Sequence, residues 1–344
     1  MRGSEMTSYE RVMTALEGGK PDRVPVMPFT RDWAVTRAGF TFSEVLENPD
    51  KYVYAQYRAL RDFQADVVWD LMGVNAECEA MGSVLKFQDD APPSVVEFFV
   101  EELSRDLPRL RLPNPYKDGR LPELLRVVQR LKELVRSETP VIAYVQGPFR
   151  LAAMLRGTER LLRDMYKSGE KCQELLTIAT DSLIIYGAAL VNSGADIIMI
   201  AEPFMSADMM SRDLALKVEP YFTRLAEALK ETGAKVLVHL CGSFNDRLDM
   251  LKKMGTHGVS LDEKNDLARA REVLGPKTCL IGNVSPSGTI FMGTPEAVAK
   301  EARLAIDNAG REGAFILASG CLIPKAAPGR NIEAMIQVAK ETGY

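Results

Sequence analysis

Two short stretches of the chain combine residue types that bind metal ions. In VHLCG (238–242), His239 lies two positions before Cys241, and LASGCLIP (317–324) contains Cys321. His239 is one of only two histidines in 344 residues, and it ends an apolar run. Because residues i and i+2 of a strand share a face, a single ion can contact the side chains of both His239 and Cys241.

A His, Cys, Cys set of ligands favours zinc. The set is borderline-soft, and three protein ligands leave a fourth position for a substrate, as in catalytic zinc sites. The same residues also have a plainer interpretation, because a buried cysteine is most often a small hydrophobic residue. Spacing alone leaves both interpretations open.

The remaining cysteines and the composition narrow the class of protein. Cys78, Cys172 and Cys279 are scattered, and we interpret them as structural. A small, odd number of cysteines argues against a disulfide framework and for a reducing cytosol, so we expect a cytoplasmic protein. The net charge is −4 with no long run of one sign, which argues against a nucleic-acid partner. No wholly apolar stretch approaches the roughly 18 residues of a membrane span.

The pattern of apolar runs predicts an α/β fold. Helical patterns at 121–137, 172–194, 214–233 and 294–310 lie between apolar, β-branched runs, and Thr294 is a suitable cap for the last of them. Near-continuous apolar strands that alternate with helices predict a parallel sheet, and eight of them predict a closed (β/α)8 TIM barrel. The alternative is an open doubly wound sheet, although no G-x-G-x-x-G follows the first strand. The eight expected strands are 23–29, 66–73, 141–147, 196–203, 235–242, 258–263, 279–285 and 314–321.

One segment interrupts this alternation. Residues 74–120 are rich in proline and charge, and we expect them to form an irregular insertion over one mouth of the barrel. No repeat, low-complexity tract or clear linker is present, so we predict a single domain over residues 1–344.

Polar residues gather at the predicted strand ends. Barrel enzymes carry their chemistry at the carboxyl ends of the strands, so these residues are expected to converge on one rim. Glu202 and Asp262 are candidates for a further metal ligand, an orienting partner or a proton carrier, or else they cap helices and make structural ion pairs. Asn283 is expected to orient a substrate or to pin a loop. The strand-end residues are Gln146, Glu202, His239, Cys241, Asp262, Glu263, Asn283 and Cys321.

Longer motifs resemble a known superfamily. The chain resembles the uroporphyrinogen decarboxylase superfamily and, within it, the cobamide-dependent methyltransferases. The resemblance extends over nearly the whole chain and implies an α/β barrel, in agreement with the strand pattern. The motifs that carry it are ERVMTALEGGKPDRVPVMPF, VQGPFRLAAMLRG, NSGADIIMIAEP, HLCG, SLDEKNDL, GNVSPSGTIFMGTPEAV and GCLIPKAAPGRNIEAM.

Two branches of that superfamily carry different signature motifs, and this chain can be compared with both. The decarboxylases carry a signature resembling P-x-W-x-M-R-Q-A-G-R after the first strand. Here VMPFTRDWAVTRAGF contains Arg31 and Arg37 but lacks that signature. The methyltransferases carry H-x-C followed much later by C, and His239, Cys241 and Cys321 match it residue for residue. The resemblance therefore implies zinc bound by these three residues.

The resemblance also implies methyl transfer to or from a corrinoid. The chain shows no D-x-H-x-x-G cobalamin signature, so the cobalamin is expected on a partner corrinoid protein. Zinc would lower the pKa of a thiol such as coenzyme M, or act as a Lewis acid on an ether oxygen. The alternatives to methyl transfer are a decarboxylase and a non-catalytic binding protein.

We expect a methyl ether, such as a methoxylated aromatic, to be the methyl donor, which would make the chain an O-demethylase component. The alternative is methyl transfer to coenzyme M. An apolar ring suits the aromatic and sulfur-bearing side chains expected near the mouth, although such residues are more often packing. The expected substrate-binding residues are Phe29, Trp33, Gln146, Phe149, Phe204 and Met205.

Overall fold

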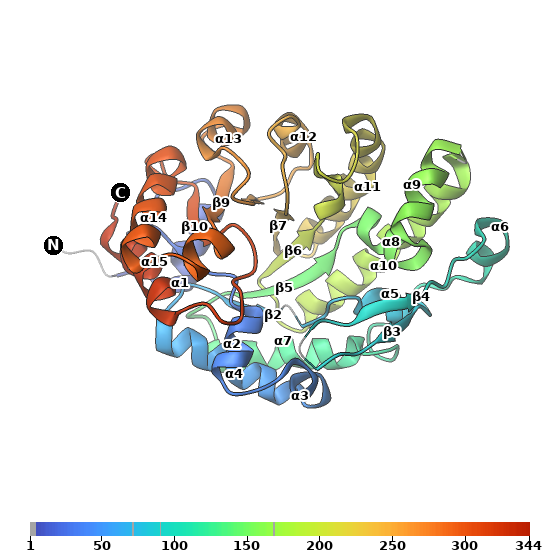
Figure 1. Ribbon diagram of the computed structural model, residues 1–344, viewed down its shortest axis with the longest axis horizontal. Helices are drawn as coiled ribbons and strands as arrows, with labels where there is room; N and C mark the ends of the chain where they lie inside the picture. Colours follow the sequence, from blue (N-terminus) through green and yellow to red (C-terminus); the bar gives the residue numbers. More distant parts are fainter. Residues whose placement is uncertain (1–4, 71, 90, 168) are drawn as a thin grey trace.

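A computed structural model describes residues 5–70, 72–89, 91–167 and 169–344. Its main sheet has eight parallel strands in the order β1-β10-β9-β8-β7-β6-β5-β2, curled into a barrel (Figure 1). The amide of Asp66 donates to the carbonyl of Val26 over 3.0 Å, which joins the two edges. All eight expected strands are confirmed, as β1 (Val26–Met27), β2 (Val68–Asp70), β5 (Val141–Gln146), β6 (Ile197–Ala201), β7 (Lys235–Leu240), β8 (Gly258–Leu261), β9 (Cys279–Val284) and β10 (Phe315–Ser319).

Helices surround the barrel, and the four expected ones are present. These are α7 (Leu121–Val135), α10 (Gly169–Asn192), α11 (Arg212–Glu231) and α14 (Pro295–Ala309), and Thr294 caps α14 by accepting from the amide of Ala297. The other elements are α2 (Arg31–Arg37), α3 (Phe42–Glu47), α4 (Pro49–Phe63), α8 (Pro148–Arg156), α9 (Thr158–Lys167), η2 (Pro203–Met205), α12 (Leu248–Lys253), α13 (Leu267–Leu274), η3 (Pro286–Phe291) and α15 (Gly329–Glu341).

The apolar residues of the strands form two layers. Alternate residues, such as Leu237 and Met199, point into the barrel, whereas their neighbours pack outward against the helices. The first helix, α1 (Ser8–Leu16), adds four apolar side chains to the inner layer. Leu16 reaches β8, since a Cβ on Gly258 would lie 3.1 Å from its side chain. Helix α1 therefore closes the amino-terminal mouth.

The insertion at 74–120 lies at the opposite mouth and is more regular than expected. It contains α5 (Ala76–Ala80), an antiparallel pair β3 (Val84–Lys86) and β4 (Ser94–Glu97), α6 (Leu103–Asp106) and η1 (Leu107–Arg109). Its hairpin and α6 project away from the barrel in Figure 1. Glu77 of α5 accepts hydrogen bonds from the amide and the side chain of Gln146, at the carboxyl end of β5.

Helix α10 departs from our expectation about apolar stretches. By length and composition alone it could cross a membrane, because an 18-residue window has a mean hydropathy of 1.5. Of that window, 56% is buried inside the protein. Helices α8 and α11 pack against it, so its apolar character is that of a core helix.

Candidate metal centre

The strand register places one row of inward side chains near the carboxyl mouth. Gln146 pairs with Ala201, Ala201 with His239, and His239 with Ser260. Alternation along β7 then turns Cys241 to the same face as His239. Cys321 follows β10, and its loop brings the thiol across the mouth.

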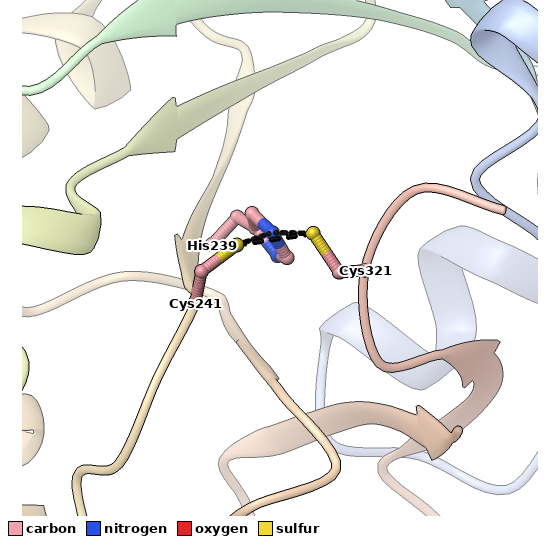
Figure 2. A group of neighbouring side chains, drawn as sticks. All are labelled: His239, Cys241 and Cys321. Atoms are coloured by element: carbon pink, nitrogen blue, oxygen red, sulfur yellow. Dashed lines mark hydrogen bonds between the residues drawn. The ribbon is translucent and has the colours of Figure 1, made fainter. Parts of the chain in front are cut away.

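The three expected metal ligands converge. His239 Nε2 lies 3.0 Å from Cys241 Sγ, the two sulfur atoms lie 3.0 Å apart, and Cys321 Sγ lies 3.6 Å from His239 Nε2. Figure 2 shows the three side chains pointing toward one another. His239 is 6% exposed, and both cysteines are partly exposed, so the group is open on one side.

Contacts with Ser260 and Phe29 fix the orientation of the His239 ring. Its Nδ1 lies 3.0 Å from Ser260 Oγ, and its ring contacts Phe29, with ring centroids 4.9 Å apart. When Nδ1 carries the proton and donates it to Ser260, Nε2 is a free lone pair directed at the two sulfurs. An orienting partner of this kind is the usual companion of a metal-binding histidine.

The donors fit a zinc ion. Zinc bonds of 2.0–2.3 Å in a tetrahedron place such donors about 3.5 to 3.8 Å apart. The distance of 3.6 Å between Cys321 Sγ and His239 Nε2 already agrees. The two distances of 3.0 Å that involve Cys241 Sγ need to widen by several tenths of an ångström. The two thiols are not equivalent: a hydrogen bond from Cys241 holds the pKa of Cys321 well below its ordinary value, and the same bond raises the pKa of Cys241. The lowered pKa of Cys321 favours its thiolate, the form that binds metals.

Asp262, Glu263 and Asn283 surround the loops of the centre. Asp262 accepts from the amides of Gly242 and Lys264 at 3.1 and 3.0 Å, which ties the loop after Cys241 to the end of β8. Asn283 donates to the Asp262 carbonyl over 3.2 Å and so pins the same loop. A Cβ on Gly320 would lie 2.8 Å from Glu263 Oε2, so this carboxyl adjoins the residue before Cys321. Desolvation, with repulsion from Asp262, raises the pKa of Glu263 to about 7.

Glu202 lies at the mouth but faces the helices. Because Ala201 points into the barrel, the next side chain points outward, and its Oε2 accepts from the amides of Phe149 and Arg150 at 2.9 and 3.2 Å. It therefore caps α8, the alternative considered from the sequence. Burial raises its pKa to about 7. The structure does not bring it into the group formed by His239, Cys241 and Cys321.

Most of the expected substrate-binding side chains are core residues. Trp33 is 2% exposed and donates its indole N–H to the Ala327 carbonyl, whereas Phe149 and Met205 are fully buried against the outer layer. These contacts argue against an aromatic substrate pocket built by them. Phe29 packs inside the barrel on Trp69 and His239, and the half-buried Phe204 contacts Phe149. Gln146 is buried, and its side-chain carbonyl has no hydrogen-bond partner among the described residues.

Sequence reasoning missed three residues beside the centre: Ser260, Tyr144 and Arg150. The first two lie inside predicted strands, where the chain gives no sign of which alternate residues face inward. A polar residue two positions from a strand end is the one signal that was present. Arg150 lies in the first turn of α8, and the sequence alone does not show that this turn faces the carboxyl mouth.

Comparison with known proteins shows the family to which the chain belongs. The chain matches the uroporphyrinogen decarboxylase (URO-D) family over residues 7–342, and it belongs to that family. It is 28% identical to the methylcobamide:CoM methyltransferase MtbA of Methanosarcina acetivorans, over 99% of this chain and 100% of the relative. MtaA of Methanosarcina barkeri, also a methylcobamide:CoM methyltransferase, is 29% identical over 98% of this chain and 99% of its own length.

A solved structure places the chain within the family. A methyltransferase from Methanosarcina mazei superposes with a TM-score of 0.90 at 27% identity, and the match covers 98% of this chain and 99% of the other. The resemblance to the superfamily, its methyltransferase branch and the barrel fold are therefore confirmed. The chain is an enzyme of the methyltransferase kind.

Proposed function

We propose that this chain is a zinc- and corrinoid-dependent methyltransferase that acts with a partner corrinoid protein. The convergence of His239, Cys241 and Cys321 at the open mouth of the barrel carries this proposal. The three residues would hold zinc, which supplies an electrophilic position that lowers the pKa of a bound thiol or polarises an ether oxygen. A reduced cytosol, expected from the free cysteines, suits these thiols.

The chain's own residues would prepare the site in three ways. Ser260 would accept a hydrogen bond from Nδ1 of His239, so that Nε2 would be the ligand atom. Asp262 and Asn283 hold the loop that carries Cys241. The inner apolar layer below, with Phe29 against His239, closes the barrel beneath the centre, so a substrate and the partner's corrinoid must both approach from the carboxyl mouth.

Methyl transfer to a thiol is the better supported reaction. Two thiolates neutralise Zn²⁺, which favours alkylation of a bound thiolate, and both methyltransferase relatives described above are named for coenzyme M. The methyl ether that we expected from the sequence depended on aromatic and sulfur-bearing side chains, of which Trp33, Phe149 and Met205 are core residues. Demethylation of a methyl ether is the second candidate reaction. Glu263 supports it, because a carboxyl with a pKa of about 7 suits the donation of a proton to a departing oxygen.

A direct comparison of the two reactions tests the proposal. Zinc-loaded protein is assayed for demethylation of methylcobalamin by coenzyme M and for methylation of cob(I)alamin by methoxyarenes. We expect the thiol reaction to dominate and to fall at least about 100-fold in Cys241→Ala. Cys172→Ala, a buried cysteine outside the centre, is the matched control. Absence of both reactions would contradict the proposal.

A further inference from the structure

Two side chains at the carboxyl mouth carry hydrogen-bond donors that have no partner. Tyr144 of β5 points into the barrel and is 7% exposed, and its buried hydroxyl makes no hydrogen bond within the described ranges. Arg150 of α8 lies beside it, with Cζ 5.9 Å from the Tyr144 ring centroid. The Nε of Arg150 is also buried without a partner among the described residues. Buried polar atoms are rarely left unpaired, so such a cluster points to a missing ligand.

The most deeply buried arginines of the described chain form ion pairs with carboxylates. Arg31 forms a fork with Asp32 at 2.5 and 2.7 Å, and Arg247 forms one with Asp246 at 2.8 and 2.9 Å. For Arg150, no comparable ion pair occurs in the described part of the chain. Its uncompensated charge distinguishes it from these structural arginines.

The acidic groups nearest to Arg150 bond to other partners. Glu77 is buried and accepts from the amide and the side chain of Gln146. Glu202 accepts from the backbone amides of Phe149 and Arg150 rather than from the guanidinium. Neither carboxyl forms an ion pair with the Arg150 side chain in the described part of the chain, so the guanidinium carries an unpaired positive charge at this edge of the mouth. A partly dehydrated cation without a counter-charge favours an anion.

The pair formed by Tyr144 and Arg150 lies near the metal centre. Tyr144 lies two residues before Gln146, which shares the inward row of His239. Strands β5, β6 and β7 are consecutive neighbours, so Tyr144 and His239 face the same interior space across one intervening strand. A small molecule that reaches the centre with one end can contact Tyr144 and Arg150 with the other.

We propose that Arg150 and Tyr144 bind the anionic end, a carboxylate or sulfonate, of the small-molecule substrate whose reacting sulfur or oxygen lies at the metal centre. The guanidinium donates a charge-assisted hydrogen bond and the phenol adds a second. The inference rests on the proposed function and names the class of its substrate. It also assigns specificity to two residues outside the metal-binding set.

The test compares thiols that differ in charge. Mercaptoethanesulfonate, mercaptopropionate and mercaptoethanol are titrated calorimetrically into zinc-loaded protein, and each is then used as methyl acceptor from methylcobalamin. We expect the wild type to prefer one or both anionic thiols, and the better of the two separates sulfonate from carboxylate. Arg150→Gln is expected to reduce that preference about 10- to 100-fold, and Arg150→Lys to reduce it less. Tyr144→Phe is expected to act in the same direction.

Matched controls separate this effect from misfolding. Arg311→Gln changes a 73% exposed arginine just after α14 and is expected to keep the wild-type preference. Equal weakening of charged and neutral thiols in Arg150→Gln, or a wild type without preference for charge, would overturn the inference. The proposed function fails separately, if neither a thiol nor a methoxyarene exchanges a methyl group with the corrinoid, and the calorimetric comparison still decides the inference in that case.

Discussion

The two mouths of the barrel differ in how fully their most deeply buried polar groups are hydrogen-bonded. At the amino-terminal mouth, the carboxylate of Asp66 is fully buried and accepts from Ser8, Arg11, Arg23 and the Val26 amide at 2.8 to 2.9 Å. At the carboxyl mouth, Tyr144, Gln146, Arg150 and Glu202 each have a buried polar atom without a partner in the described structure.

This difference separates stability from function within one fold. A saturated carboxylate stabilises the end that α1 closes. Unpaired donors and two thiols at the open end cost stability unless a metal ion or substrate completes them. The contrast can be tested at each end by single substitutions.

The largest effect on stability is expected at Asp66. Asp66→Ala removes the shared carboxylate of Arg11 and Arg23, which leaves Arg11 with Asp22 as its remaining partner and Arg23 without an ion pair among the described residues. We expect a loss of about 3 to 5 kcal/mol in the free energy of unfolding, measured by urea denaturation. A loss below about 1 kcal/mol would show that the amino-terminal network is not structural.

A smaller, pH-dependent effect is expected at Glu202. Its pKa is raised by burial to about 7 from 4.5, so its folded form holds the proton longer than the unfolded chain does. Its contribution is fully present below pH 4.5 and is lost as the pH rises toward 7. Glu202→Gln should abolish this pH dependence, which amounts to on the order of 2 kcal/mol in the free energy of unfolding. Urea midpoints for the two proteins across that range measure it, and parallel curves would contradict it.

Ser260 tests the orientation of the metal ligand. Ser260→Ala removes the partner of His239 Nδ1 without touching the ligand atoms. We expect zinc affinity to fall about 10- to 100-fold while the fold is retained. Competition with a chelator of known affinity measures the change, and unchanged affinity would show that the apolar contact with Phe29 suffices.

The smallest effect on stability is expected at Tyr144. Because its buried hydroxyl has no hydrogen-bond partner in the described part of the chain, Tyr144→Phe should change the free energy of unfolding by less than about 0.5 kcal/mol, or raise it. Urea denaturation beside the wild type measures the change. A loss above about 1 kcal/mol would reveal a partner for this hydroxyl in solution and weaken the contrast between the mouths.

The sequence predicted the barrel and the convergence of His239, Cys241 and Cys321 well, because both depend on short-range patterns. Apolar runs gave eight strands, and H-x-C placed two ligands on one face. The aromatic pocket was less well predicted, since Trp33 and Phe149 lie on helices whose inner faces depend on tertiary packing. Glu202 shows the same limit: one residue of alternation decides whether a strand-end carboxylate faces the site or a helix. The single-domain assignment stays a prediction.

The central claim is that His239, Cys241 and Cys321 bind one zinc ion. Elemental analysis of protein purified without chelator tests it most directly, beside Cys241→Ala, Cys321→Ala and the control Cys172→Ala, each checked for folding. We expect about one zinc per chain in the wild type and the control, and a loss of zinc in both centre variants. Zinc-free wild-type protein, or zinc retained in folded Cys241→Ala and Cys321→Ala, would contradict the account.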